Sequence, residues 1–247
     1  MFTVKNEFEK TGFAVETLGL DTNKGSISDK DLILLPVPFT RDGVNINCPL
    51  TGDIIPIDLL CSLPEKTKVF GGGKLRIKNY TDYLSLNEYA IKNAVLTAEG
   101  AIAFAIENSG LAVWQSKILV IGYGRVGKIL ADRLCGFKPR LTVSARSASD
   151  FAMLDAAGIN RIRTDEIDNR QSRFDIVFNT VDIKFSPATA KTLKNCLFLD
   201  LSTCGGFDDG VIQSTGLLYR KLPGIPAKVS SEKAGKIIAE TVISNIS

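Results

Sequence analysis

Apolar segments alternate with helical patterns along nearly the whole chain, which is typical of parallel sheets covered by helices. Short apolar runs that end in Gly or Pro predict strands in the first third of the sequence, and a second series predicts buried strands further on. These runs are 13–20, 31–38 and 67–73, followed by 117–122, 140–145, 175–180 and 196–202. We therefore expect an α/β fold with two doubly wound parallel-sheet domains and a cleft between them.

Helices are predicted between these runs by a period of 3.6 residues and by their caps. The segment 96–110 indicates a helix with Thr97 as its N-cap and Gly110 just past its end. A capping box at 147–150 and the Ser-Pro pair at 186–187 mark two further helix starts. One buried helix face is indicated by Val126, Ile129, Leu130 and Leu134.

The composition excludes several classes of protein. Of the 247 residues, 45% are hydrophobic and 23% are charged, an ordinary globular balance, and the net charge of +3 is too weak to indicate nucleic acid or a membrane surface. No apolar run approaches the ~20 residues of a spanning helix, and the first ten residues lack the build of a signal peptide. We therefore expect no nucleic-acid partner and no membrane segment.

The five cysteines indicate a reduced compartment. They never form a CxxC pair, and the chain has no histidine that could share a metal with them. Such cysteines usually act as small buried hydrophobes in a reducing environment. We expect a cytoplasmic protein without a metal site.

The stretch 117–134 carries the most specific chemical signal. Its glycines fit G-x-G-x-x-G between a predicted strand and an amphipathic helix, and the next strand ends about twenty residues on. In this motif the first glycine permits a tight turn, the second lets the backbone approach a pyrophosphate, and the third lets helix and strand pack closely. The helix N-terminus then presents its amides to the phosphates. The alternative is an α/β turn that is merely rich in glycine. We predict that a dinucleotide is bound by Gly122, Tyr123, Gly124, Arg125, Val126 and Gly127.

The end of the following strand favours NADP over NAD. An NAD site usually places Asp or Glu there to accept the ribose hydroxyls. This sequence has no carboxylate at 144–147, and its first acid is Asp150. Arg146 can stack on the adenine and pair with a 2′-phosphate, and Ser147 can donate to that phosphate. The alternative for Arg146 is a solvated surface arginine.

Two further strand ends point to the same edge of the sheet, because ligands lie beyond the carboxyl ends of parallel strands. The segments that follow these strands are 179–182 and 200–206. We predict that Thr180 and Ser202 border the nicotinamide. The alternative for both residues is ordinary turn chemistry.

Several segments together resemble the A-subunit family of dipicolinate synthase. Besides the glycine motif and Arg146, the resemblance is carried by PVPFTRDGVNIN (36–47), TAEGAIAFAIEN (97–108) and LPGIPAKVSSEKAGKIIAETV (222–242). It covers nearly the whole chain and is more specific than the glycines alone. The family makes pyridine-2,6-dicarboxylate for bacterial endospores, so the resemblance implies an NADP-dependent oxidoreductase.

The resemblance also implies an architecture and a partner. A Rossmann NADP domain at 95–227 would lie beside a smaller, flavodoxin-like substrate domain at 1–94, as in D-2-hydroxyacid dehydrogenases. The amphipathic segment 228–247 would pack back onto the first domain. Family members typically begin with a strand before the helix that 2–12 predicts, so we expect the first sheet to lack that strand. The implied partner is the flavoprotein-like B-subunit of the synthase, and the sequence leaves a homo-oligomer open.

The implied substrate is a small dicarboxylate, either 4-hydroxy-tetrahydrodipicolinate or the dihydrodipicolinate that remains after it loses water. Its oxidation gives an aromatic ring, so no imidazole base is obligatory, and the protein supplies orientation and charge. The resemblance places Arg41 and Lys228 as cations for the carboxylates. We assign substrate binding to Arg41 and Thr97, and catalysis to Lys228 and Glu99. Glu99 is the available carboxylate for proton transfer, with stabilisation of a helix N-terminus as its alternative role.

Other functions remain as alternatives. An NADP-dependent 2-hydroxyacid dehydrogenase or an S-adenosylhomocysteine hydrolase would share the architecture, but the absence of histidine argues against both. A nucleotide-binding protein without chemistry of its own is the alternative from a different class. Turnover by the purified chain, with and without the B-subunit, separates these possibilities.

Overall fold

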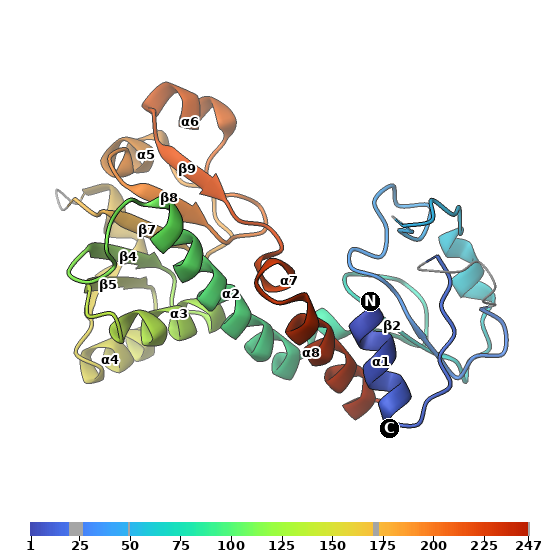
Figure 1. Ribbon diagram of the computed structural model, residues 1–247. Coiled ribbons are helices and arrows are strands. Elements are labelled where there is room, and N and C mark those ends of the chain that lie inside the picture. The colour runs from blue at the N-terminus through green and yellow to red at the C-terminus, as the bar shows by residue number, and fades with distance from the viewer. Residues whose placement is uncertain (20–26, 49, 170–172, 247) are drawn as a thin grey trace. The chain divides into compact units, whose positions relative to one another are not determined.

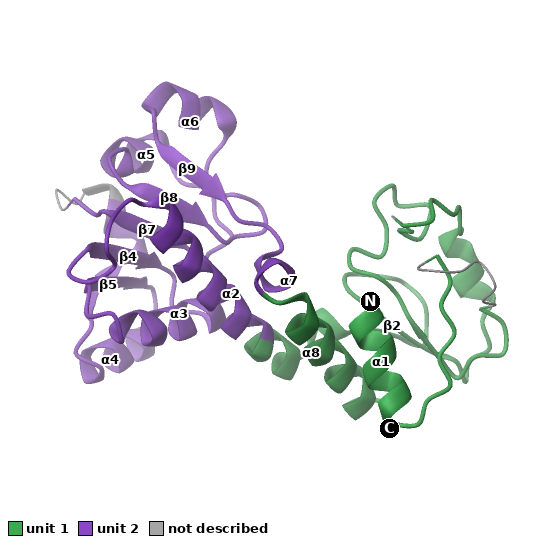
Figure 2. Cartoon of the chain, viewed as in Figure 1, with its two compact units in different colours: residues 1–92, 230–247 green, residues 93–229 purple. Residues whose placement is uncertain are grey.

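The described strands form two parallel sheets, and each sheet belongs to a separate unit of the chain (Figure 1). The computed structural model describes residues 1–19, 27–48, 50–169 and 173–246. Unit 1 comprises residues 1–92 and 230–247, and unit 2 comprises residues 93–229 (Figure 2). The predicted α/β class with parallel sheets is confirmed.

Unit 2 is built on a six-stranded sheet in which every neighbouring pair is parallel. The strands are β4 (Lys117–Ile121), β5 (Arg140–Ala145), β6 (Asn160–Arg163), β7 (Ile176–Asn179), β8 (Leu197–Asp200) and β9 (Leu218–Lys221). Their spatial order, β6-β5-β4-β7-β8-β9, is that of the dinucleotide-binding Rossmann fold. The four strands predicted in this region are confirmed, whereas β6 and β9 were not predicted.

Helices cover both faces of this sheet. They are α2 (Asn87–Asn108), α3 (Arg125–Cys135), α4 (Ala148–Ala156), α5 (Pro187–Leu193), α6 (Asp209–Thr215) and α7 (Ile225–Val229), with a 3₁₀ turn at Thr164–Asn169. Side chains that alternate along β4 pack on opposite faces, since Ile118 and Val120 contact the α2–α3 side and Leu119 and Ile121 contact the α5 side. The predicted caps at Ser147 and Ser186 are confirmed, as each hydroxyl accepts an N–H from the first turn of its helix.

Helix α2 begins ten residues earlier than its sequence pattern predicts, so Thr97 is not an N-cap. Its hydroxyl instead donates to the carbonyl of Asn93, at 2.9 Å, which is how threonine is accommodated inside a helix. The buried face of α2 also continues back through Ala94 and Tyr89. Glu99 therefore lies in the helix interior, and the alternative role of stabilising a helix N-terminus is wrong for it.

By length and composition, α2 is the one helix in the described residues that could cross a membrane, which contradicts the expectation that no apolar run is long enough. Ala98, Ala101 and Ala105 are fully buried in the core of unit 2. Gly100 lies on the same helix, and a Cβ there would come within 2.3 Å of Ile225 and of Val229 of α7. These contacts are typical of the core helix of a globular protein.

Unit 1 contains a three-stranded parallel sheet in the order β1-β2-β3, formed by Leu32–Leu34, Lys68–Gly71 and Tyr80–Asp82. Two 3₁₀ helices, η1 (Ile57–Ser62) and η2 (Tyr83–Ser85), belong to the same unit. The prediction of a strand at 13–20 is wrong for 13–19, which pairs with no strand in the described part of the chain, and residue 20 lies outside it. Alternating apolar residues form a strand only where a neighbouring edge supplies hydrogen bonds.

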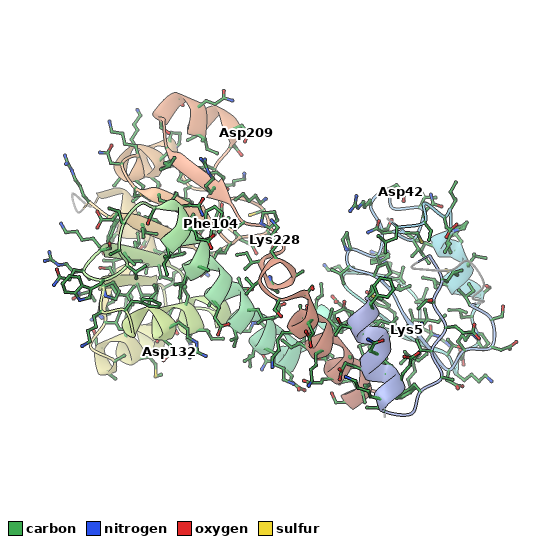
Figure 3. The ribbon with its side chains drawn as sticks, in the orientation of Figure 1. Lys5, Asp42, Phe104, Asp132, Asp209 and Lys228 are labelled. Atoms are coloured by element: carbon green, nitrogen blue, oxygen red, sulfur yellow. The ribbon has the colours of Figure 1, made fainter. Side chains whose placement is uncertain are left out.

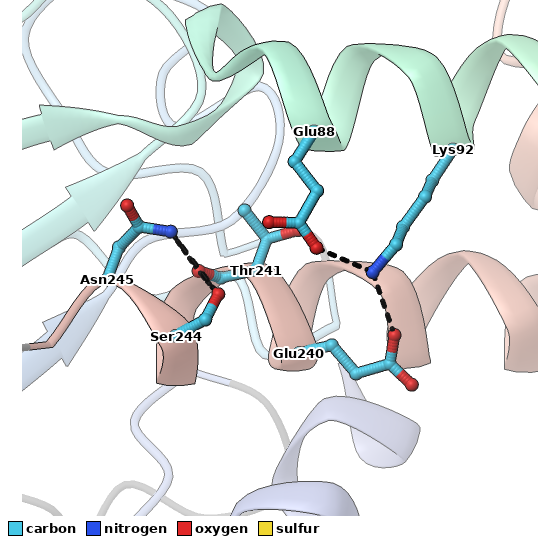
Figure 4. A network of polar contacts seen from close by, with 6 residues as sticks. All are labelled: Glu88, Lys92, Glu240, Thr241, Ser244 and Asn245. Atoms are coloured by element: carbon cyan, nitrogen blue, oxygen red, sulfur yellow. Dashed lines mark hydrogen bonds and ion pairs between the residues drawn. The ribbon is translucent and has the colours of Figure 1, made fainter.

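The two ends of the chain meet in unit 1, where α1 (Phe2–Lys10) packs against α8 (Ser231–Ser244). A Cβ on Gly235 would lie 2.9 Å from the Cβ of Thr3, so the helices approach closely at this glycine. The first turns of α2 are joined to α8 by Lys92, whose ammonium lies 2.7 Å from Glu88 and 3.3 Å from Glu240 (Figure 4).

Candidate functional site

The loop between β4 and α3 contains two glycines that the fold itself requires. Gly122 has a φ of +98°, and a Cβ there would lie 2.4 Å from Val181 and 2.7 Å from the hydroxyl of Thr180. A Cβ on Gly127 would lie 2.2 Å from the carbonyl oxygen of Gly122. The lack of a Cβ at both glycines lets the amino end of α3 lie close to the carboxyl ends of β4 and β7. This is the position at which the strand order reverses.

Gly124 is different, because nothing in the fold requires a glycine there. It is the N-cap of α3 with a φ of −80°, which any residue adopts, and a Cβ at this position would have no heavy atom within 4 Å. A side chain would instead project into open space at the first turn of α3. The amides of a first helical turn have no acceptor within the helix, so this space suits an anion such as a pyrophosphate. The residues present therefore fit a dinucleotide. Tyr123, Arg125 and Val126 complete the loop.

The carboxyl end of β5 carries a group of charged and polar side chains. Arg146 is exposed, and Ser147 caps α4 by accepting the N–H of Asp150 at 3.1 Å. The Ser147 hydroxyl donates to the Asp150 carboxylate at 2.7 Å, and the ammonium of Lys128 lies 3.2 Å from the other oxygen of that carboxylate. The hydrogen bond from Ser147, together with Lys128, lowers the pKa of Asp150. Lys128 also lies over the ring of Tyr123, 5.1 Å from its centroid.

Thr180 and Ser202, predicted to border the nicotinamide, both take part in hydrogen bonds that hold their own loops. The Thr180 hydroxyl donates to the carbonyl of Ile121 at 2.9 Å and so ties β7 to the glycine loop. The Ser202 hydroxyl accepts the N–H of Gly205 at 3.1 Å, and Ser202 is buried. Both residues lie at the carboxyl edge of the sheet, and their contact with a cofactor stays a prediction.

The sequence analysis did not single out the buried carboxylate of Asp200, which organises this edge. Asp200 is completely buried and accepts hydrogen bonds from the Tyr219 hydroxyl at 2.5 Å, the Gly206 N–H at 2.5 Å, the Ser202 N–H at 2.9 Å and the Asn179 amide at 3.0 Å. Burial raises the pKa of Asp200, but hydrogen bonds from the hydroxyls of Ser202 and Tyr219 and from the N–H groups of Gly206 and Ser202 outweigh it, so the pKa lies below its usual value. The available signal was a polar residue ending each of two otherwise apolar strands, Asn179 after IVF and Asp200 after LFL.

A second carboxylate supports the same loop. Asp182 is exposed and accepts the backbone N–H groups of Thr203 at 2.5 Å and of Cys204 at 3.2 Å. The backbone N–H groups of the segment after β8 therefore donate to two carboxylates, that of buried Asp200 and that of exposed Asp182. In the order of the sheet, β7 lies between β4, which the glycine motif follows, and β8, which this loop follows.

The residues predicted to contact the substrate are divided between the two units. In unit 1, exposed Arg41 belongs to a loop that Asp42 organises by accepting the N–H groups of Val44 at 2.9 Å and Asn45 at 2.8 Å (Figure 3). In unit 2, Lys228 is exposed in α7. Glu99 of the same unit is exposed on α2, and its carboxylate lies 3.9 Å from the Arg133 guanidinium. The predicted residues that the structure brings together are thus those at the carboxyl edge of the sheet in unit 2, from the glycine loop to Ser202.

The described residues contain no group of three or more His, Cys, Asp or Glu side chains that could hold a metal ion. All five cysteines are free thiols.

Comparison with known proteins relates this chain to one enzyme family. No family model matches the sequence. The chain is 31% identical to the A-subunit of dipicolinate synthase from Bacillus subtilis strain 168 over an alignment of 230 positions, and the match covers 86% of this chain and 76% of that protein. Its fold is similar to the crystal structure of the dipicolinate synthase A chain from Bacillus subtilis, with a TM-score of 0.88 and 22% identity, covering 99% of this chain and 92% of that one. The crystal structure of the corresponding dipicolinate synthase chain from Bacillus halodurans matches with a TM-score of 0.90 and 20% identity, over 99% and 93% of the two chains. This chain therefore belongs to the A-subunit family of dipicolinate synthase.

Proposed function

We propose that this chain is an NADP-dependent oxidoreductase, the A-subunit of a dipicolinate synthase, and that it binds NADP(H) at the carboxyl edge of the sheet in unit 2. The observation that carries the proposal is Gly124. Its missing side chain leaves open space at the first turn of α3, although neither its backbone angles nor its packing needs a glycine. A bound pyrophosphate accounts for that glycine, because its oxygens must approach the backbone amides closely.

The proposed substrate is 4-hydroxy-tetrahydrodipicolinate or dihydrodipicolinate, which is oxidised to the aromatic pyridine dicarboxylate. Bound NADP⁺ would supply the chemistry of a hydride acceptor. Arg41 and Lys228 are the proposed cations for the substrate carboxylates, and Thr97 is the proposed neutral contact. Glu99 and Lys228 are the proposed proton-transfer groups, since the chain has no histidine. Because the Thr97 hydroxyl donates within α2, it would act toward a substrate as an acceptor.

The proposal includes a partner and a compartment. The relative from Bacillus subtilis is named as one subunit of a synthase, which implies a second subunit. We propose a flavoprotein-like B-subunit in that role. Free thiols at all five cysteines suit a reducing environment, so the cytoplasm is the proposed location.

The test of cofactor binding is Gly124→Ala, measured by titration calorimetry with NADP⁺ and NADPH. We expect the affinity to fall at least tenfold, about 1.4 kcal/mol, with only a small fall in melting temperature, because the added methyl group meets no neighbouring atom and alanine is a poorer N-cap than glycine. The matched control is Gly210→Ala in α6, another glycine without a positive φ whose Cβ would meet no heavy atom within 4 Å. An unaltered affinity in Gly124→Ala would contradict the proposed site.

The test of the reaction is turnover of the dihydrodipicolinate substrate by the purified chain with NADP⁺, followed at 340 nm, with and without the B-subunit. We expect activity that depends on NADP⁺ and increases when the B-subunit is added. Cofactor binding without turnover under both conditions would make the chain a nucleotide-binding protein only and refute the enzymatic part of the proposal.

A further inference from the structure

The carboxyl end of β5 holds an ion pair that the proposed cofactor site does not yet explain. Lys128 comes from the second turn of α3, and Asp150 comes from the first turn of α4. Their side chains are partly exposed, 49% for Lys128 and 27% for Asp150, and the two charged groups lie 3.2 Å apart. An exposed pair of this kind contributes little to stability, because water and salt screen its charges. Its position therefore needs another reason.

The carboxylate of Asp150 is already engaged on both oxygens. One accepts the Ser147 hydroxyl at 2.7 Å, and the other pairs with Lys128 at 3.2 Å. The acid of an NAD site instead directs its oxygens to the two ribose hydroxyls. Asp150 is thus held by side chains of its own unit in a capping box, three residues beyond the cap Ser147.

An unpaired carboxylate at this place would repel a 2′-phosphate, since like charges close together are unfavourable in a partly desolvated site. Lys128 removes that difficulty. An ammonium has three donors on a flexible stem, so it can keep its bond to Asp150 and donate to a phosphate at the same time. Its place over the Tyr123 ring, 5.1 Å from the centroid, keeps the charge beside the glycine loop.

We propose that Lys128 is a specificity-determining residue for NADP(H): it pairs with Asp150 in the free protein and binds the 2′-phosphate, together with Arg146, when the cofactor is present. This inference rests on the proposed function, because it assigns residues within the proposed cofactor site. The opposing interpretation is that Asp150 is the ribose-binding acid of an NAD site and that Lys128 only stabilises it.

The test uses the full-length chain and measures the binding of NADP⁺ and NAD⁺ to each variant by calorimetry. We expect Lys128→Met, which keeps the aliphatic stem over Tyr123, to weaken NADP⁺ binding about tenfold and to change NAD⁺ binding less than twofold. Lys128→Gln should behave in the same way. Lys117→Met is the matched control, because Lys117 is exposed at the opposite end of β4 and should affect neither cofactor.

Asp150→Asn separates the two interpretations by the direction of its effect. We expect NADP⁺ to bind threefold or more tightly, since Lys128 is released and the repulsion is gone, while NAD⁺ binding stays the same. A loss of NAD⁺ affinity in Asp150→Asn, or equal losses of both cofactors in Lys128→Met, would overturn the inference. If wild type binds NADP⁺ and Arg146→Asp weakens it while both Lys128 variants do not, only this inference fails. If wild type binds neither cofactor, the proposed function fails with it.

Discussion

Replacing Asp200 with alanine should destabilise unit 2 strongly, because four donors share this one buried carboxylate. The Tyr219 hydroxyl, the amides of Gly206 and Ser202 and the side chain of Asn179 all donate to it at 2.5 to 3.0 Å. A buried donor left without its acceptor costs about 1–3 kcal/mol, and water entering the vacated space would restore part of this. We therefore expect a loss of about 3–5 kcal/mol in the free energy of unfolding, which is typical when one member of a buried charged network is removed.

The measurement is urea denaturation at pH 7, followed by far-UV circular dichroism and by the fluorescence of the single tryptophan, Trp114, which belongs to unit 2. Two probes are needed because a chain with two units can unfold in two transitions. The control is Asp208→Asn, which breaks the exposed pair with Lys184 at 2.7 Å and should cost less than about 1 kcal/mol. If Asp200→Ala costs no more than this control, the network does not hold unit 2 together.

The same carboxylate predicts a pH dependence. The pKa of Asp200 is lower in the folded protein than in the unfolded chain, so its contribution is fully present above the usual pKa of about 4 and is lost as the pH falls through the folded value. The wild type should therefore lose stability in acid more steeply than Asp200→Asn, which has no carboxylate to protonate. Parallel curves of unfolding free energy against pH between about 2 and 5 would refute this assignment.

Three further changes test other parts of the molecule. Gly100→Ala should lower the melting temperature, because its Cβ would lie 2.3 Å from Ile225 and from Val229. Overpacking of this kind costs about 1–3 kcal/mol of stability, which exceeds the gain of up to about 1 kcal/mol in helix propensity. A higher melting temperature would contradict this. Arg146→Asp should weaken NADP⁺ binding by several kcal/mol and NAD⁺ binding much less, as calorimetry can show, whereas equal losses would exclude Arg146 from the phosphate site. Arg41→Ala should raise the substrate KM about tenfold without altering NADP⁺ affinity, and Arg41→Lys should impair binding too, since it lacks the two-pronged donor. If steady-state kinetics show that Arg41→Ala leaves KM and kcat unchanged, Arg41 is a surface residue without a role in substrate binding.

The sequence predicted best those elements whose own residues determine them. Strands β4, β5, β7 and β8 are buried apolar runs, and the caps Ser147 and Ser186 act within one helical turn, so local patterns suffice for both. The edge strand β6 reads Asn-Arg-Ile-Arg and has one buried side chain. Such a segment becomes a strand only because β5 offers hydrogen bonds, and a single sequence does not show that neighbour. The segment 13–19 shows the reverse case, an apolar alternation without a partner strand in the described part of the chain.

The candidate site was predicted in the same uneven way. The glycine motif is local, and its position at the turn from β4 to α3 is as expected. Asn179 and Asp200 join two different strands, and their sequence signal was a polar residue at the end of each apolar strand. The Lys128–Asp150 pair joins two helices and has no spacing that a sequence pattern could reveal. Thr97 was misplaced because threonine caps helices and also occurs within them, and only the hydroxyl bond to Asn93 distinguishes the two.

The pairing of α1 with α8 has a consequence for the order in which the chain is completed during synthesis. Unit 2 is one continuous segment, 93–229, so it can fold as soon as that segment has left the ribosome. Unit 1 has to wait, because Thr3 packs against Gly235, which is made nearly a whole chain later. Once unit 2 has folded, the flexible chain between α1 and α8 is shorter, so the entropy cost of bringing these two helices together is smaller. A translation product that stops after Val229 would thus carry a finished unit 2 and an α1 helix whose apolar face is still exposed to chaperones and proteases.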